Sequence, residues 1–206
     1  MVSHRLLALF AAQHSVMARR CFKSLLVRVV PRPIERSTYV LASSLALAAL
    51  FTFWEPIDGT VWLATDPTLR GALHALFAAG WLIVLVSTFL FDHFDLFGLK
   101  QVTFHLLGRP ASAPRFATPS TYNFVRHPLY AGWLLAFWAT PTMTASHLVF
   151  AAGTTVYILV AIRLEERDLL REHGEAYAEY RRRVPMLVPA MRSGGLRHPA
   201  RPARDA

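Results

Sequence analysis

The sequence predicts an all-α protein, a polytopic integral membrane helical bundle. Of its 206 residues, 54% are hydrophobic and only 17% are charged, and the chain holds 5 Trp and 14 Phe, more than the core of a soluble domain of this size needs. The net charge is +9, yet the basic residues gather in a few connecting segments, which indicates membrane topology and argues against nucleic-acid binding. We expect four clear spans and one short N-terminal span.

The N-terminal part contains an incomplete span followed by a basic loop. Leu6–Ala18 is apolar but shorter than the ~20 residues that a spanning helix needs, and it carries Gln13 and His14. Residues 19–36 hold six Lys or Arg against one Glu, so we place this loop on the cytoplasmic side. Pro31 and Pro33 should break any long helix there. The single cysteine, Cys21, excludes an internal disulfide and a cysteine-cluster metal site.

Two full spans follow, at Thr38–Trp54 and Gly71–Phe91. The loop between them is acidic and has no Lys or Arg before Arg70, so it should face outward. After the second span, polar and apolar residues alternate through residues 92–101 at the presumed inner boundary. Ionisable groups at such a depth are costly unless they have a function. We therefore name His93 and Asp95 as catalytic candidates, the alternative being that polar residues simply end the span here.

Two further spans form a hairpin. A stiff, proline-containing cytoplasmic loop over residues 100–126 precedes an apolar segment at Pro128–Thr140. A tight polar turn at residues 141–146 leads into a second apolar run, which starts at His147 and ends at Ile162. Because both polar ends of this hairpin return to the cytoplasm, residues 126–130 should come close to whatever follows Ile162.

The third span should begin at His127. Pro128 has no N–H and a fixed φ, which suits the first helical position. The free N–H groups and the positive dipole end of this helix, together with Arg126 and His127, would favour an anionic group such as a carboxylate. The alternative is an ordinary interfacial helix start, with Arg126 reaching to lipid headgroups.

The last helix should continue past Ile162 into the cytosol and stop at a glycine cap, Gly174. Glu165 and Glu166 then emerge at the membrane face, either as functional groups or as a solvated collar. A short amphipathic helix over residues 175–183 places Tyr177 and Tyr180 on one face. The apolar segment 184–189 should pack back on the bundle, so residues 1–189 form one domain, and the basic tail 190–206 should be disordered.

These C-terminal groups suit a zwitterionic, nucleotide-like ligand. Arg126 and His127 supply a positive pole, Glu165 and Glu166 a negative pole and partners for ribose hydroxyls, and Tyr130, Tyr177 and Tyr180 aromatic faces. No Gly-rich phosphate loop is present, which argues against ATP or NAD. The histidines do not show the spacing of a metal-binding helix, so we expect no metal.

Several of these blocks resemble a known family. Residues 126–132, the Glu165–Glu166 pair, residues 174–180 and residues 184–189 resemble the C-terminal signature of the isoprenylcysteine carboxyl methyltransferase superfamily. Residues 13–19, 93–99, 137–143 and 147–151 are similar to the bacterial methanethiol S-methyltransferases, a branch near the NnrU-like membrane proteins. The resemblance covers nearly the whole chain to Pro189. One departure is that family members usually carry a further apolar helix before the block at residues 13–19.

The resemblance implies an integral membrane enzyme, in the bacterial inner membrane with a cytoplasmic C-terminus, that transfers the methyl group of S-adenosylmethionine to methanethiol and gives dimethyl sulfide. His93 and Asp95, with His14 as a third choice, would assist the thiol. The expected cofactor-binding residues are Arg126, His127, Leu129, Tyr130, Glu165, Glu166, Tyr177 and Tyr180. The expected partners are the small thiol substrate and the lipid bilayer. Two alternatives stay open: another acceptor, such as a carboxylate or a larger lipid thiol, and a non-catalytic accessory or transport protein.

Overall fold

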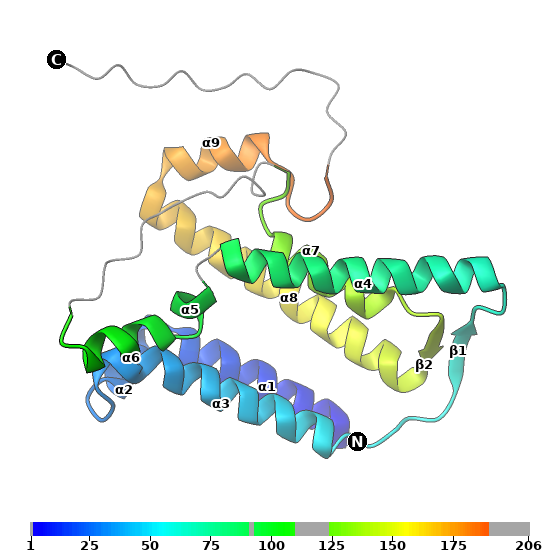
Figure 1. Cartoon of the computed structure of the whole chain (residues 1–206), viewed down its shortest axis with the longest axis horizontal. Helices are drawn as coiled ribbons and strands as arrows, with labels where there is room; N and C mark the ends of the chain where they lie inside the picture. The colour runs from blue at the N-terminus through cyan, green and yellow to red at the C-terminus, as the bar shows by residue number, and fades with distance from the viewer. Residues whose placement is uncertain (1, 91–92, 110–123, 190–206) are drawn as a thin grey trace.

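The computed structural model describes residues 2–90, 93–109 and 124–189, and most of these residues are helical (Figure 1). The elements follow one another along the chain as α1 (Val2–Ala18), α2 (Arg20–Leu26), α3 (Arg32–Thr52), β1 (Thr60–Leu63), α4 (Pro67–Leu90), α5 (His93–Leu96), α6 (Leu99–Leu106), α7 (Pro128–Trp138), β2 (Thr142–Thr144), α8 (Ala145–His173) and α9 (Glu175–Arg183).

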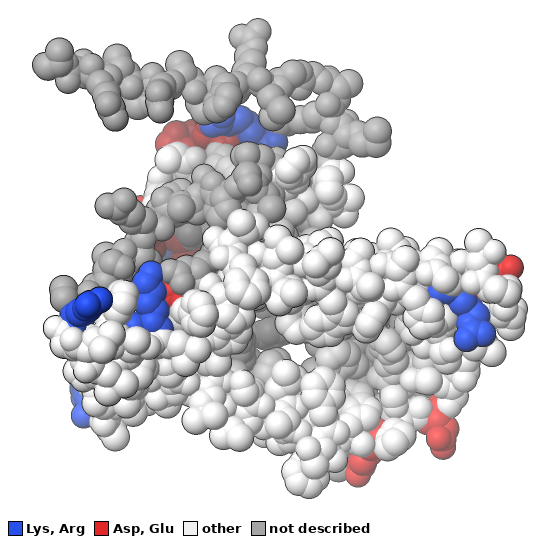
Figure 2. Space-filling view, viewed as in Figure 1, with Lys and Arg blue, Asp and Glu red and all other residues white. Residues whose placement is uncertain are grey.

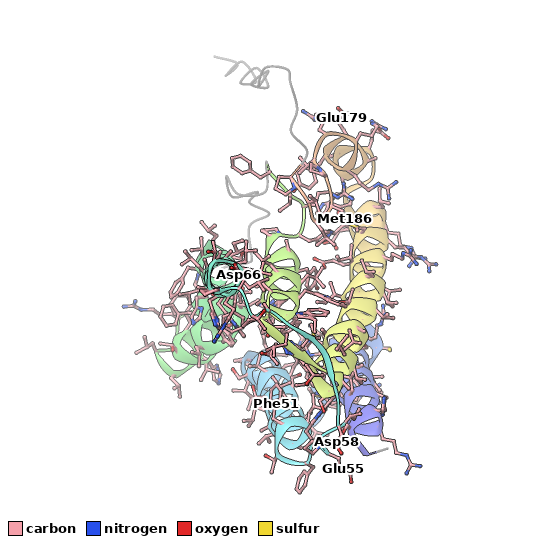
Figure 3. All side chains as sticks on the ribbon, turned by 90° about the vertical axis from the view of Figure 1, so that its right-hand side faces the viewer. Phe51, Glu55, Asp58, Asp66, Glu179 and Met186 are labelled. Atoms are coloured by element: carbon pink, nitrogen blue, oxygen red, sulfur yellow. The ribbon has the colours of Figure 1, made fainter. Side chains whose placement is uncertain are left out.

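Two of the described helices, α4 and α8, are long and apolar enough to cross a membrane. Charged side chains lie toward the ends of the molecule with a broad uncharged band between them (Figure 2). In the side view, Glu55 and Asp58 lie at one end and Glu179 and Met186 at the other (Figure 3). The first and third predicted spans are less clear, because α3 starts with Arg32, Glu35 and Arg36, and α7 has only 11 residues, about 16 Å.

The helices form two groups. In one group α7 packs along α4, with α8 against α7; in the other, α1 packs along α3 and α6 lies against α3 (Figure 1). The α4–α7 contact is a close backbone crossing: a Cβ on Gly80 would lie 2.6 Å from the Ala136 nitrogen, and one on Gly132 would lie 2.8 Å from the Gly80 oxygen. Small residues allow such crossings between apolar helices. We call the boundary between the two groups, where α1 meets α8, the seam.

The prediction of an all-α chain needs one correction, because β1 and β2 form a small antiparallel sheet, with Leu63 opposite Thr142. Both strands belong to segments that the sequence indicated as loops. Main-chain hydrogen bonds from Ala64 N to Pro141 O (2.8 Å) and from Ala145 N to Gly59 O (2.9 Å) extend the pairing. The sheet satisfies backbone groups that a plain turn would leave unpaired, and it ties the two loops together at the end opposite α9 (Figure 1).

The proline prediction is confirmed, and one loop prediction changes. As predicted, no long helix runs through residues 19–36, because α2 ends at Leu26; Pro33 also lies in the first turn of α3, which starts at Arg32, where a proline loses no helical hydrogen bond. Residues 99–106, predicted as part of an irregular loop, form α6, which begins after Gly98 in the left-handed region (φ 75°). Most of the remaining loop, and the predicted tail at residues 190–206, lie outside the described residues.

The predicted start of α7, the predicted end of α8 and the return of the segment after α9 are confirmed. Helix α7 begins at Pro128 after His127, and α8 runs without a break to His173, where Gly174 (φ 54°) ends it. The segment after α9 returns to the start of α7: Arg126 N donates to Pro185 O (2.8 Å) and His127 N donates to Met186 O (3.1 Å).

Candidate functional site

Five side chains predicted as cofactor contacts meet where α7 begins beside the C-terminal part of α8. We call this group the carboxylate cluster; its members are Arg126, His127, Tyr130, Glu165 and Glu166. Two consecutive residues of α8 thus face three residues around the start of α7, at the place that the predicted hairpin brings together. The cluster continues into α9 through Tyr177 and Tyr180.

Arg126 is almost fully engaged by the protein. Its Nε donates to Glu166 Oε1 (2.8 Å), and its Nη1 donates to the carbonyl oxygens of Arg181 and Val184. Its side chain is 10% exposed. Within the described residues, none of these hydrogen bonds uses Nη2. A ligand carboxylate could therefore accept hydrogen bonds from Nη2 of Arg126, whose guanidinium is already held in place by the protein.

His127 bridges the two carboxylates. The imidazole is 5% exposed, with Nε2 3.1 Å from Glu166 Oε1 and Nδ1 3.9 Å from Glu165 Oε2. The carboxylates of Glu165 and Glu166 therefore lie beside the first turn of α7, where free N–H groups and the helix dipole favour negative charge. The sequence suggested that a ligand carboxylate would occupy this end of α7; the structure shows that the protein's own carboxylates are there.

Glu165 is the accessible carboxylate of the pair. Its side chain is 47% exposed, against 12% for Glu166, and it accepts one hydrogen bond, from the Tyr130 hydroxyl (3.2 Å). An exposed carboxylate with spare acceptor capacity suits an ammonium group or the hydroxyls of a ribose. Leu129 lies half-buried in the same turn of α7 and contributes only apolar surface.

Tyr177 and Tyr180 form an aromatic pair on α9, with ring centroids 5.8 Å apart. Burial raises the pKa of each phenol to about 12, so both stay neutral at physiological pH. Tyr177 is 5% exposed, and its hydroxyl has no hydrogen-bond partner among the residues that the structure describes. A buried hydroxyl without a partner is costly.

The residues present fit a zwitterionic nucleoside such as S-adenosylmethionine. The Tyr177 hydroxyl, which has no partner among the described residues, can donate a hydrogen bond to a ligand. The Glu165 carboxylate can accept hydrogen bonds from cationic or hydroxyl groups. The tyrosine rings can stack on a base or face a sulfonium. The described residues contain no group of three His, Cys, Asp or Glu side chains that could hold a metal ion.

His93 and Asp95 lie apart from the carboxylate cluster, on α5. Asp95 is held by Arg36 Nη1 (2.7 Å) and by the Gln101 amide (2.8 Å). His93 stacks on Phe89, with ring centroids 4.6 Å apart, and its Nδ1 lies 3.3 Å from Thr88 Oγ1. Each of these two side chains thus has its own polar partner.

A second polar group, which the sequence indicated only through His14, lies at the seam. Tyr39 of α3 contacts His14 of α1, and Tyr157 of α8 contacts Ser15 of α1 with 3.2 Å between the two hydroxyl oxygens. The sequence indicated Tyr157 only as a single phenol within the predicted span that ends at Ile162. We call this group, which also includes Ser43, the seam cluster.

Comparison with known proteins gives one family-model match and several close relatives. A phospholipid methyltransferase family model matches residues 74–176, a range that includes α7, Glu165 and Glu166. The chain is 57% identical to a methanethiol S-methyltransferase of Crocosphaera subtropica, over 89% of this chain and 72% of that protein. It is 55% identical to methanethiol S-methyltransferase 1 of Bradyrhizobium diazoefficiens, over 91% of this chain and 66% of that protein.

A more distant relative is Nurim of Xenopus laevis, 34% identical over 79% of this chain and 60% of that protein. No solved structure matches the chain. The matches at more than half identity cover about nine tenths of the chain. The predicted resemblance is confirmed, and the chain belongs to the methanethiol S-methyltransferase family.

Proposed function

We propose that this protein transfers a methyl group from S-adenosylmethionine to methanethiol, which yields dimethyl sulfide and S-adenosylhomocysteine. The observation that carries the proposal is the carboxylate cluster: an open carboxylate, an arginine edge and an unpartnered tyrosine hydroxyl lie together in a chain more than half identical to methanethiol S-methyltransferases. When bound, S-adenosylmethionine supplies an activated methyl group on a sulfonium.

The cofactor side is built from α7, α8 and α9. Glu165 and the Tyr177 hydroxyl bind the amine or the ribose, and Arg126 Nη2 meets the ligand carboxylate. His127 and Glu166 hold these groups in place, because both are nearly buried and bonded to each other. Tyr130 and Tyr180 line the site with aromatic surface, and Leu129 adds apolar contact. Fixed binding groups of this kind accelerate a transfer mainly through proximity and alignment.

On the acceptor side, His93 keeps its predicted role as a polar contact for the thiol. Asp95 is held by Arg36 and Gln101, so we propose that its carboxylate positions α5, and with it His93, rather than touching the thiol. The charge-reversal experiment in the Discussion tests the assignment of Asp95.

The proposed setting is the bacterial inner membrane, with a cytoplasmic C-terminus and residues 1–189 acting as one domain. The basic segment 19–36 and the cluster at the α7–α8 end would then face the cytoplasm, where the cofactor is made, and the acidic loop before α4 would face outward. In this arrangement α3 and α7 complete a four-span bundle around α4 and α8, with α1 as a short fifth helix.

The test is calorimetric titration of the detergent-purified protein with S-adenosylhomocysteine, followed by headspace detection of dimethyl sulfide after S-adenosylmethionine and methanethiol are added. Glu165→Gln keeps the shape of the side chain and removes its charge, and we expect it to weaken S-adenosylhomocysteine binding by about tenfold, as for a lost charge-assisted hydrogen bond. Glu172→Gln, at an exposed position of the same helix, is the matched control and should bind as the wild type does.

Each outcome of this test points to a different conclusion. Binding with dimethyl sulfide production supports the proposal. Binding without dimethyl sulfide production would indicate that the methyl acceptor is another thiol or a carboxylate. No binding by well-folded wild-type protein refutes the enzyme proposal and favours a non-catalytic membrane protein.

A further inference from the structure

The seam cluster joins the two helix groups through polar side chains. Tyr39 and Ser43 come from α3, His14 and Ser15 from α1, and Tyr157 from α8. Their contacts are direct, with Tyr39 Oη 2.9 Å from His14 Nε2 and Ser15 Oγ 3.2 Å from the Tyr157 hydroxyl. Polar groups within membrane-spanning segments are costly, and they mark functional sites.

The seam cluster also reaches the proposed cofactor site. The Tyr130 hydroxyl, which donates to Glu165, interacts electrostatically with the hydroxyls of Tyr157 and Tyr39. The seam cluster therefore lies within electrostatic range of Tyr130 and of the proposed cofactor site.

The contacts of His14 fit a neutral imidazole that carries its proton on Nδ1. Nδ1 lies 3.1 Å from Ser43 Oγ, whereas the Tyr39 hydroxyl is 2.9 Å from Nε2 and 3.1 Å from Nδ1. With Nδ1–H donating to Ser43, Nε2 is left with a lone pair, and the Tyr39 hydroxyl donates to it. Tyr39 Oη then keeps its own lone pairs for another donor.

Access to this place suits a small neutral thiol. The surface is hollowed between α4 and α3, which lie one above the other in the view (Figure 2), and the side chains along both helices are largely apolar. A thiol that dissolves in the bilayer can approach from this side, whereas the charged cofactor approaches through the end that carries Glu165.

We propose that Tyr39 and His14 form the proton relay that activates the acceptor thiol, an inference that rests on the proposed function. The thiol S–H proton passes to Tyr39 Oη as the Tyr39 proton passes to His14 Nε2. The thiol sulfur forms the new C–S bond with the methyl carbon, and the electron pair of the broken bond stays on the donor sulfur, which becomes a neutral thioether. The imidazolium of His14 releases the extra proton to water afterwards. Tyr39 is the catalytic residue, and Ser43 positions His14.

The test compares two thiols of different acidity. Methanethiol is almost wholly protonated at neutral pH and needs the relay, whereas 2,2,2-trifluoroethanethiol, which its fluorines acidify, is largely ionised at pH 8 and does not. For Tyr39→Phe and for His14→Asn, we expect the turnover of methanethiol to fall about 100-fold and that of the acidic thiol to fall less than about threefold. The double variant should fall no further than either single variant, because the two residues act as a unit.

Two controls accompany these variants. S-adenosylhomocysteine affinity, measured by calorimetry, should not change, because neither residue belongs to the carboxylate cluster. His74→Asn makes the same replacement at an exposed histidine of α4 and should leave both thiol reactions unchanged. If His14→Asn does not fold, Tyr39→Phe carries the test, since it removes one oxygen and keeps the ring.

Three results with active wild-type protein would overturn the relay: retained methanethiol turnover in Tyr39→Phe, an equal loss with both thiols, or a loss of S-adenosylhomocysteine binding. A wild type that binds S-adenosylhomocysteine but methylates neither thiol overturns the proposed function itself, and the relay with it. That case is recognised before any variant is made, so the two failures are distinct.

Discussion

Arg126 Nε donates a hydrogen bond to Glu166 Oε1 across 2.8 Å, and the pair joins residues 40 positions apart in the chain. Both side chains are nearly buried, and His127 contacts the same carboxylate oxygen. This ion pair fixes the start of α7 against α8. Because the groups proposed to bind the cofactor lie around it, the pair sets both the stability and the geometry of the site.

Removal of the Glu166 carboxylate should destabilise the protein. Glu166→Ala leaves the Arg126 charge buried without its partner, which costs about 3 kcal/mol, whereas Glu166→Gln keeps one acceptor oxygen and should cost clearly less. Thermal unfolding in detergent, followed by tryptophan fluorescence, measures the effect, with Glu172→Ala as the exposed control. Equal melting temperatures for Glu166→Ala and the wild type would show that the pair contributes nothing.

Tyr177→Phe should change stability and binding in opposite directions. The variant removes a buried hydroxyl that has no partner among the described residues, so the melting temperature should stay constant or rise. Affinity for S-adenosylhomocysteine should fall by about five- to tenfold, as for the loss of one hydrogen bond. Unfolding curves and calorimetry on the same preparation provide both values. Unchanged affinity would exclude the Tyr177 hydroxyl from the cofactor site.

Gly80→Ala should weaken the packing of α4 on α7. The added Cβ would lie 2.6 Å from a backbone nitrogen of α7, and backbone cannot move aside as a side chain can, so we expect a loss of about 1–3 kcal/mol. Gly71→Ala is the matched control in the same helix, because a Cβ there meets nothing within 4 Å. If both variants melt at the same temperature, the close crossing is not a determinant of stability.

The acidity of Glu179 should depend on Arg182. The Arg182 hydrogen bonds lower the pKa of the Glu179 carboxyl, so its contribution to α9 is present above the ordinary pKa of Glu and is lost as the pH falls through the lowered value. Arg182→Gln should raise this pKa toward its ordinary value, and Arg183, which also contacts Glu179 (3.0 Å), limits the change. Carboxyl ¹³C NMR titration in detergent measures it; Arg171→Gln on α8 should leave the Glu179 titration unaltered.

A charge reversal tests the role of Asp95. Asp95→Arg or Arg36→Asp alone should lower both the melting temperature and the methyl transfer rate, because each places like charges at a contact of 2.7 Å. The double variant should recover both, since it restores an ion pair between α3 and α5. Recovery of the melting temperature without recovery of turnover would mean that the Asp95 carboxylate itself takes part in the reaction.

The parts of the fold that depend on neighbouring residues could be predicted from the sequence. The start of α7 follows from Pro128, the end of α8 from Gly174, and the meeting of Glu165 and Glu166 with residues 126–130 from the polar ends of one hairpin. The β1–β2 sheet could not be predicted, because it pairs Leu63 with Thr142, and no local pattern encodes such a distant pairing.

For the candidate site, the residue types could be predicted from the sequence, but the contacts that packing creates could not. The residue types of the carboxylate cluster indicated a charged ligand site. The sequence did not show that Arg126 uses its Nε and Nη1 groups to bond to Glu166 and to two carbonyl oxygens within the protein. Tyr39 and Tyr157 escaped attention because each is a lone phenol in an apolar helix. Only packing brings one beside His14 and the other beside Ser15.

The bonds from the backbone of Arg126 and His127 to Pro185 and Met186 also determine when the site is complete during biosynthesis. The ribosome adds residues 185 and 186 after all the helices that the structure describes, so α7 is synthesised long before its first residues acquire these partners. The proposed cofactor site of the nascent chain therefore stays incomplete until the segment after α9 has emerged. A truncation that removes the segment after α9 would leave the helices in place but would remove the backbone partners of Arg126 and His127.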